Sequence, residues 1–368
     1  MSRRIIFSPL LGKKTKKKRL SLAIKSMTQA LKSSIRGQTV LSEAEAAELC
    51  RSHTHLTAAA SQRAHLGSEG VCRMERLLRR CRIRNSLVRE CLAECLGVYI
   101  MILFGCGTVA QVTTSQEKNG QYLSINLGFA LGVTFGVFVS RGVSGAHLNP
   151  AVTLSLCVLG RHPWMKLPFY TFSQIFGAFL GAATVGLQYY DAILSYSGGQ
   201  LTVTGQTATA GIFSTYPAEY LSLGGGFLDQ VIGTAALLLC ILALGDQRNT
   251  SIPDYLQPLL AGATVLVIGV SMGSNSGYAL NPARDFGPRF FTYIAGWGDD
   301  VFRAGRGWWW VPLVAPCIGG LVGTLIYEML VEVHHASLSP EDQPSCQETT
   351  EAKSLELEGV EPSIGKSA

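Results

Sequence analysis

Two segments of this chain, far apart in the sequence, are nearly identical. Residues 144–151 read Ser-Gly-Ala-His-Leu-Asn-Pro-Ala and residues 276–283 read Ser-Gly-Tyr-Ala-Leu-Asn-Pro-Ala, so six of eight positions agree. Self-similarity of this kind indicates an internal duplication. The chain is therefore expected to contain two copies of one structural unit, at about residues 86–190 and 226–335.

Each copy holds three apolar stretches of about the 20 residues that an α-helix needs to cross a bilayer. With 47% hydrophobic and 15% charged residues, the chain has too few charges for a soluble globule of its size. An odd number of spans per copy makes the second copy enter the membrane from the opposite side, as in inverted repeats. The prediction is an all-α membrane protein. Its six predicted transmembrane helices lie near residues 89–110, 122–140, 167–188, 227–245, 257–273 and 311–331.

Each Asn-Pro-Ala triplet is followed by a run, near residues 150–160 and 282–293, that is too short to span a bilayer and is predicted to be a re-entrant half-helix. Asn suits the N-cap of a helix and Pro its first turn. If the two N-termini meet at mid-membrane, their partial positive charges repel cations, while the Asn carboxamides donate hydrogen bonds to water or alcohol groups. The residues predicted to form this part of a pore are Asn149, Pro150, Ala151, Asn281, Pro282 and Ala283.

The distribution of charge predicts the orientation and the tails. Twenty of the 31 Lys and Arg residues lie in the first 90 residues, where six acidic residues oppose them. By the positive-inside rule, both termini are then cytoplasmic. Residues 1–85 are predicted to form a basic, disordered cytoplasmic tail and residues 336–368 an acidic one. The first 70 or so residues also fit an organelle presequence, or translation from upstream of a natural start at Met74.

With a duplicated Asn-Pro-Ala triplet, six spans and two half-helices, residues 85–335 resemble the aquaporin family. Within that family, residues 281–289 (Asn-Pro-Ala-Arg-Asp-Phe-Gly-Pro-Arg) and the outer-loop run 210–217 are similar to the glycerol-conducting branch. The stretch 199–205, together with residues 220–223, is similar to one vertebrate member of that branch. The resemblance implies the aquaporin fold, a plasma-membrane channel and a homotetramer with one pore per subunit.

The resemblance also assigns an outer selectivity filter to Phe129, Gly269, Tyr278 and Arg284. The two aromatic rings offer apolar faces to the carbon chain of a polyol, and the guanidinium donates hydrogen bonds to hydroxyl groups and opposes cations. Water-selective relatives carry a His where this chain has Gly269. The glycine is therefore expected to leave room for molecules the size of glycerol.

Four further polar residues are predicted to support the pore. Glu94 and its counterpart Gln230 are expected to accept hydrogen bonds from the backbone of the two pore loops, because a polar group at membrane depth needs a partner. Asp285 is expected to pair with basic or backbone donors and to orient the second half-helix. His147, next to the first triplet, either makes conduction sensitive to acid or is a packing residue.

These features predict an aquaglyceroporin: a passive channel for water, glycerol and other small neutral solutes such as urea, which excludes ions and protons. A strict water channel and a membrane structural protein with a silent pore are the alternatives. No catalytic constellation, Cys-x-x-Cys pair or Cys/His spacing is evident, so neither an enzyme nor a metal or cofactor site is predicted. The expected partners are the permeants and the lipid bilayer, with no nucleic acid.

Overall fold

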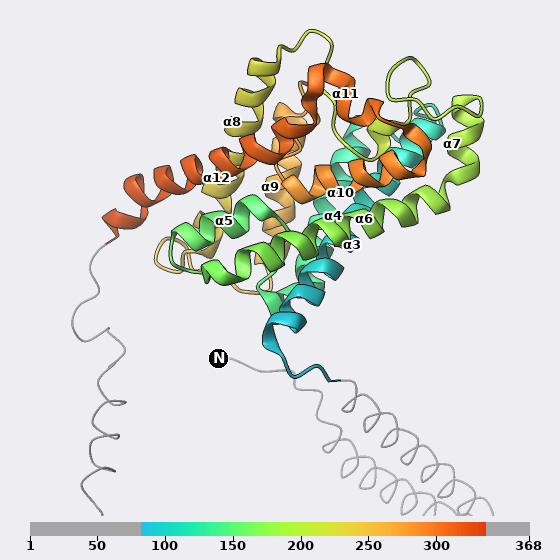
Figure 1. The fold of residues 1–368 in the computed structure, drawn as a ribbon. Coiled ribbons are helices and arrows are strands. Elements are labelled where there is room, and N and C mark those ends of the chain that lie inside the picture. Colours follow the sequence, from blue (N-terminus) through green and yellow to red (C-terminus); the bar gives the residue numbers. More distant parts are fainter. Residues whose placement is uncertain (1–81, 336–368) are drawn as a thin grey trace, which may run out of the picture. The chain divides into compact units, whose positions relative to one another are not determined.

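The computed structural model describes residues 82–335, and the predictions made for residues 1–81 and 336–368 lie outside this range (Figure 1). Every regular element in residues 82–335 is helical, which confirms the predicted all-α fold. The α-helices are α3 (Ser86–Thr114), α4 (Tyr122–Ser144), α5 (Pro150–Val158), α6 (Leu167–Gln188), α7 (Tyr190–Ser197), α8 (Leu223–Gly245), α9 (Gln257–Met272), α10 (Pro282–Thr292), α11 (Asp300–Gly307) and α12 (Val311–Leu330).

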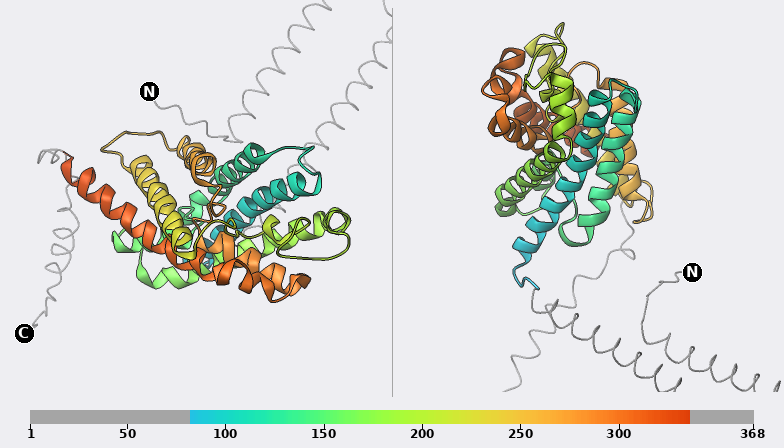
Figure 2. Two further views of the ribbon diagram at one scale, coloured as in Figure 1. Left: turned by 90° about the horizontal axis from the view of Figure 1, so that it is seen from above. Right: turned by 90° about the vertical axis from the view of Figure 1, so that its right-hand side faces the viewer.

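The packing of the helices repeats itself between the two copies. In the first copy α3 packs against α4 and α6, and in the second α8 packs against α9 and α12. The copies meet where α4 contacts α9 and where each short helix crosses to the other copy, α5 onto α12 and α10 onto α6. Seen from above, the long helices of the two copies gather on different sides (Figure 2). The copies are thus joined both by a helix pair and by the exchanged short helices.

Glycines at equivalent positions allow the closest helix contacts. A Cβ atom on Gly177 or Gly181 of α6 would collide with backbone atoms of α3, and one on Gly319 or Gly323 of α12 would collide with backbone atoms of α8. Pairs of small residues four apart are typical of tightly packed membrane helices. The same packing device therefore holds the third span of each copy.

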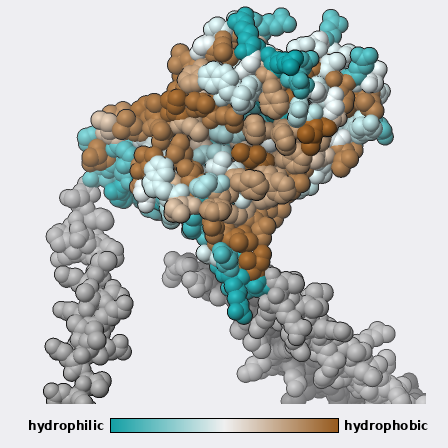
Figure 3. Space-filling model, in the orientation of Figure 1, coloured by the Kyte–Doolittle hydropathy of each residue, from teal (hydrophilic) through white to brown (hydrophobic). Residues whose placement is uncertain are grey.

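The outside of the helix bundle is apolar. Five helices in residues 82–335 are long and apolar enough to cross a membrane, and α9, with 16 residues, is a shorter apolar helix that matches the predicted span 257–273. Apolar residues gather over the body of the bundle, and polar ones gather at the end that carries α7 and α11 (Figure 3). We call that end the outer end, and the end at which α3 begins and α12 finishes the inner end. The chain is a multi-pass membrane protein.

Charged side chains join three helices at the inner end. Arg161, which follows α5, donates to Glu332, which follows α12, and Arg248 donates to the same carboxylate at 2.6 Å. Asp246, at the end of α8, lies 2.7 Å from the ring of His335. Burial acts to raise the pKa of Asp246, but hydrogen bonds from the Arg248 backbone, His335 and Tyr327 outweigh it and hold that pKa at about 2. The carboxylate therefore stays charged at any physiological pH.

Candidate functional site

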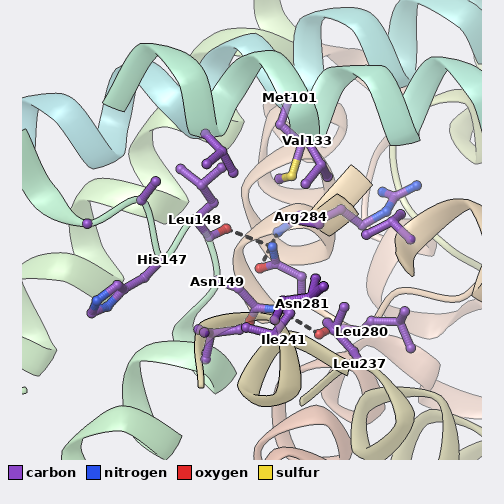
Figure 4. A pocket seen from close by; sticks show the side chains of 18 of the residues that line it. Met101, Val133, His147, Leu148, Asn149, Leu237, Ile241, Leu280, Asn281 and Arg284 are labelled. Carbon is purple, nitrogen blue, oxygen red and sulfur yellow. Dashed lines mark hydrogen bonds between the residues drawn. The ribbon is translucent and has the colours of Figure 1, made fainter. Parts of the chain in front are cut away.

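A cavity of about 280 Å³, which we call the channel, lies between the two copies. Every fourth residue of α4 lines it, namely Phe129, Val133, Val137 and Arg141, as do Gln257, Ala261 and Val265 of α9. Residues four apart lie on one face of a helix, so each helix presents one stripe to the channel. The walls are largely apolar, and Figure 4 shows Asn149 and Asn281 lying near each other in the channel, with His147 and Arg284 to either side.

The two asparagines begin the short helices and also link the copies. The Asn149 side chain accepts from the backbone N–H of Ala151 at 2.8 Å, and that of Asn281 accepts from Ala283 at 3.0 Å. Each carboxamide then donates to the other copy: Asn149 to the carbonyl of Leu280 at 2.9 Å, and Asn281 to the carbonyl of Leu148 at 2.8 Å (Figure 4). One N–H of each carboxamide is thus used between the copies, which leaves the second for other partners.

The backbone before each triplet has an unusual conformation that is the same in both copies. Leu148 and Leu280 have positive φ angles of 54° and 52°, and Ala146 and Tyr278 have 58° and 38°. A left-handed conformation costs a residue with a side chain about 1–2 kcal/mol. It persists only when surrounding contacts hold it.

Glu94 and Gln230 supply those contacts. Glu94 accepts from the backbone N–H of Leu148 at 2.7 Å and of His147 at 3.0 Å, and Gln230 accepts from Leu280 at 2.9 Å. The Glu94 carboxylate also accepts from Ser144 and Gln174. Both side chains are fully buried. In each copy, therefore, one leucine is held at its N–H by a buried polar side chain and at its carbonyl by the asparagine of the other copy.

Three of the four residues assigned to the outer filter, Phe129, Tyr278 and Arg284, line the channel, and Gly269 lies beside Tyr278. The Arg284 guanidinium lies 4.6 Å from the centre of the Phe129 ring and donates to the carbonyl of Phe213 at 2.9 Å. The Phe129 and Tyr278 rings meet edge to face with centres 6.2 Å apart. A Cβ atom on Gly269 would lie 3.0 Å from the Tyr278 ring and would overlap the side chain of Asn126. Neighbouring side chains therefore take up part of the space at Gly269. The sequence had suggested that this space is open.

A buried ion pair, which the sequence reasoning did not identify in full, anchors the outer loop. Asp285 accepts from Arg289 at 2.8 Å and from the backbone N–H of Thr215 at 2.8 Å. Arg289 also donates to the carbonyls of Thr215 and Val301. Both charged side chains are at most 1% exposed. The signal available in the sequence was the spacing of four residues, which places Asp285 and Arg289 on one side of α10.

His147 belongs to an aromatic cluster on the inner side of the triplets. Its ring centre lies 4.7 Å from that of His162 and 5.1 Å from that of Tyr170. Glu90 accepts from both Lys166 and Tyr170 beside this cluster. Burial, helped by the nearby Lys166 charge, lowers the pKa of His162. Within residues 82–335 no group of three or more His, Cys, Asp or Glu side chains is arranged to hold a metal ion.

Comparison with known proteins agrees with this geometry. The family model described as major intrinsic protein matches residues 82–327. The chain is 51% identical over 279 residues to human aquaporin-10, covering 75% of this chain and 91% of that protein, and 48% identical over 267 residues to human aquaporin-9, covering 73% and 90%. The crystal structure of the aquaglyceroporin from Plasmodium falciparum superposes with a TM-score of 0.61 at 34% identity, covering 67% of this chain and 98% of that one. The chain therefore belongs to the major intrinsic protein family, the family of the aquaporins.

Proposed function

We propose that this protein is an aquaglyceroporin, a passive channel for water, glycerol and other small neutral solutes such as urea. The observation that carries the proposal is the filter, where one cation, Arg284, stacks on Phe129 beside Tyr278 and Gly269. A polyol has a hydroxyl edge and a hydrocarbon edge, and this wall offers hydrogen-bond donors to the first and aromatic rings to the second. The aquaglyceroporin structure and the aquaporin relatives support the same assignment.

Asn149 and Asn281 would then receive the permeant at mid-membrane. The free N–H of each carboxamide donates to a passing oxygen, and the N-termini of α5 and α10 each add a partial charge of about +0.5. A cation is repelled there, and a chain of water molecules is interrupted because the central oxygen accepts from the protein on both sides. We assign ion and proton exclusion to this pair together with Arg284.

A glycerol gradient applied to proteoliposomes tests the proposal. Vesicles that contain the protein are expected to shrink and then to reswell much faster than protein-free vesicles, measured by stopped-flow light scattering. Shrinkage accelerated by the protein without faster reswelling would identify a strict water channel instead. No acceleration of either phase would favour a structural protein with a silent pore.

His147 carries a pH prediction. Burial of its ring, together with the charges of His162 and Lys166, lowers the pKa of His147 well below the ordinary histidine value of about 6.5. His147 is therefore expected to stay neutral from pH 8 to pH 5, and glycerol flux should be constant across that range. Flux measured from pH 5 to 8 should have the same pH profile in His147→Ala as in the wild type. A step in the wild-type profile that His147→Ala abolishes would contradict the packing role and identify His147 as an acid sensor.

The setting of the channel is also part of the proposal. The basic residues before α3 favour a cytoplasmic inner end, so both termini would face the cytoplasm of a cell whose plasma membrane holds the protein. A homotetramer with one pore per subunit follows from the family. The division into tail regions 1–85 and 336–368 around a channel domain, residues 86–335, is proposed on composition. The aquaporin family is one of channels, and we propose no enzymatic activity for this chain.

A further inference from the structure

Asn126 is a buried polar residue that the pore chemistry described above does not use. It lies on α4 one turn before Phe129, on the side of the helix that faces α9, and is 1% exposed. Within residues 82–335, neither its Nδ2 nor its Oδ1 atom has a hydrogen-bond partner. A buried carboxamide without partners is costly, and such groups in folded proteins call for a specific explanation.

The Asn126 carboxamide occupies the space that a side chain at position 269 would take. A Cβ atom built on Gly269 would overlap Asn126 Oδ1 and would touch the Tyr278 ring at 3.0 Å. The Tyr278 hydroxyl is also buried and, in the described part of the chain, lacks a partner. The Tyr122 hydroxyl donates to the Gly269 carbonyl at 3.4 Å and lies next to the Asn126 carboxamide. Glycine at 269 therefore brings unpaired polar atoms of two residues to one point beside the filter.

Low exposure is common to Asn126 and to the residues of the filter. Phe129, Tyr278 and Arg284, which line the channel, are themselves only 4–8% exposed, so low exposure does not separate Asn126 from the filter. A molecule that separates the Tyr278 ring from Gly269 would reach the carboxamide directly. A hydroxyl group suits this place, since it both donates to Oδ1 and accepts from Nδ2.

We propose that Asn126 is a further specificity-determining residue of the filter, whose carboxamide, next to the Tyr278 hydroxyl, binds one hydroxyl group of a polyol while Arg284 binds another. The proposal rests on the proposed glycerol channel and refines it. Gly269 has no side chain with which to supply polarity at this position. The Asn126 carboxamide, on the neighbouring helix α4 and one turn outward of Phe129, supplies that polarity instead.

The test compares glycerol with 1,2-propanediol, which has nearly the same size but one terminal hydroxyl fewer. In Asn126→Leu, where an apolar side chain of similar volume replaces the carboxamide, the ratio of glycerol to propanediol permeability is expected to fall about threefold or more, as for the loss of one hydrogen bond. Thr134→Val is the matched control, because it removes a buried hydroxyl from the same helix that is already bonded to the Ala130 carbonyl. That variant should keep the ratio of the wild type.

The outcomes separate the inference from the proposed function. If wild-type vesicles do not pass glycerol, the proposed function fails. If they do pass glycerol and the permeability ratio is unchanged in Asn126→Leu, the inference alone fails. The ratio is the specific measurement, because a change of pore size or of packing alters the permeability of both solutes together. Asn126→Ala removes the hydrogen bond without adding bulk, so it should lower the ratio as well, and it serves if the leucine variant does not fold.

Discussion

Replacing Asp285 by alanine is expected to destabilise the protein by about 3–5 kcal/mol, because it leaves the Arg289 guanidinium buried without its counter-ion. Arg289 would keep its bonds to the Thr215 and Val301 carbonyls, but two neutral acceptors do not compensate a full charge in a buried site. The measurement is the midpoint of thermal unfolding of the purified protein in detergent. Thr215 also loses its acceptor, so the outer loop should loosen first.

The chain contains a matched control for this substitution. Asp299 and Arg303 form a second Asp–Arg pair with the same spacing, but their side chains are 62% and 74% exposed. Exposed pairs contribute little to stability. Asp299→Ala should therefore unfold at nearly the wild-type temperature. Equal effects of the two substitutions would show that burial does not set the importance of the Asp285–Arg289 pair.

Replacing Glu94 by glutamine is expected to disturb both pore loops at once. All four groups that contact the Glu94 carboxylate are donors, so the NH₂ group of a glutamine would face donors and leave some of them unpaired. Each buried donor left unpaired costs about 1–3 kcal/mol. Because the carbonyl of Leu148 holds Asn281, displacement of that loop should also reduce water and glycerol flux per protein molecule. Thermal unfolding and stopped-flow light scattering measure the two effects.

Glu90→Gln is the control, since it makes the same change one helical turn away. Glu90 accepts from Lys166 and Tyr170 near the inner end, where its side chain is 15% exposed. Water can replace part of that interaction, and a glutamine oxygen can still accept from Tyr170. The expected loss of stability and flux is small. A Glu94→Gln protein that matches Glu90→Gln in both measurements would contradict the role proposed for Glu94.

Local patterns in the sequence predicted most of the fold. The duplicated triplets and the apolar stretches are patterns of residues that are close in the sequence. The elements predicted from them are present: the half-helix expected at 150–160 is α5, and the span expected at 257–273 is α9. The short outer helices α7 and α11 were not predicted, because they lie between spans and are too short to leave a clear apolar period. The comparisons confirm the family, and one of the similar structures is that of an aquaglyceroporin.

The sequence predicted which residues form the site but not the contacts between them. Self-comparison and family resemblance named the filter residues, and the structure brings them together, although their roles in conduction stay predictions. What could not be read from the sequence was pairing over long distances. Nothing near Asn126 indicates that its carboxamide lies beside Gly269, and the spacing of Asp285 and Arg289 does not show that Thr215 completes their network. Such contacts depend on helix crossings that are fixed only in the assembled bundle.

The exchange of hydrogen bonds between Asn149 and Leu280, and between Asn281 and Leu148, has a consequence for biosynthesis. The partner of Asn149 lies 131 residues further along the chain, so the first pore loop leaves the ribosome long before its carbonyl acceptor has been translated. The first loop cannot reach its final conformation in a nascent chain that contains only the first copy. Pore assembly is therefore a late event, which follows insertion of the second copy, and a chain that stops between the copies holds no finished half-channel.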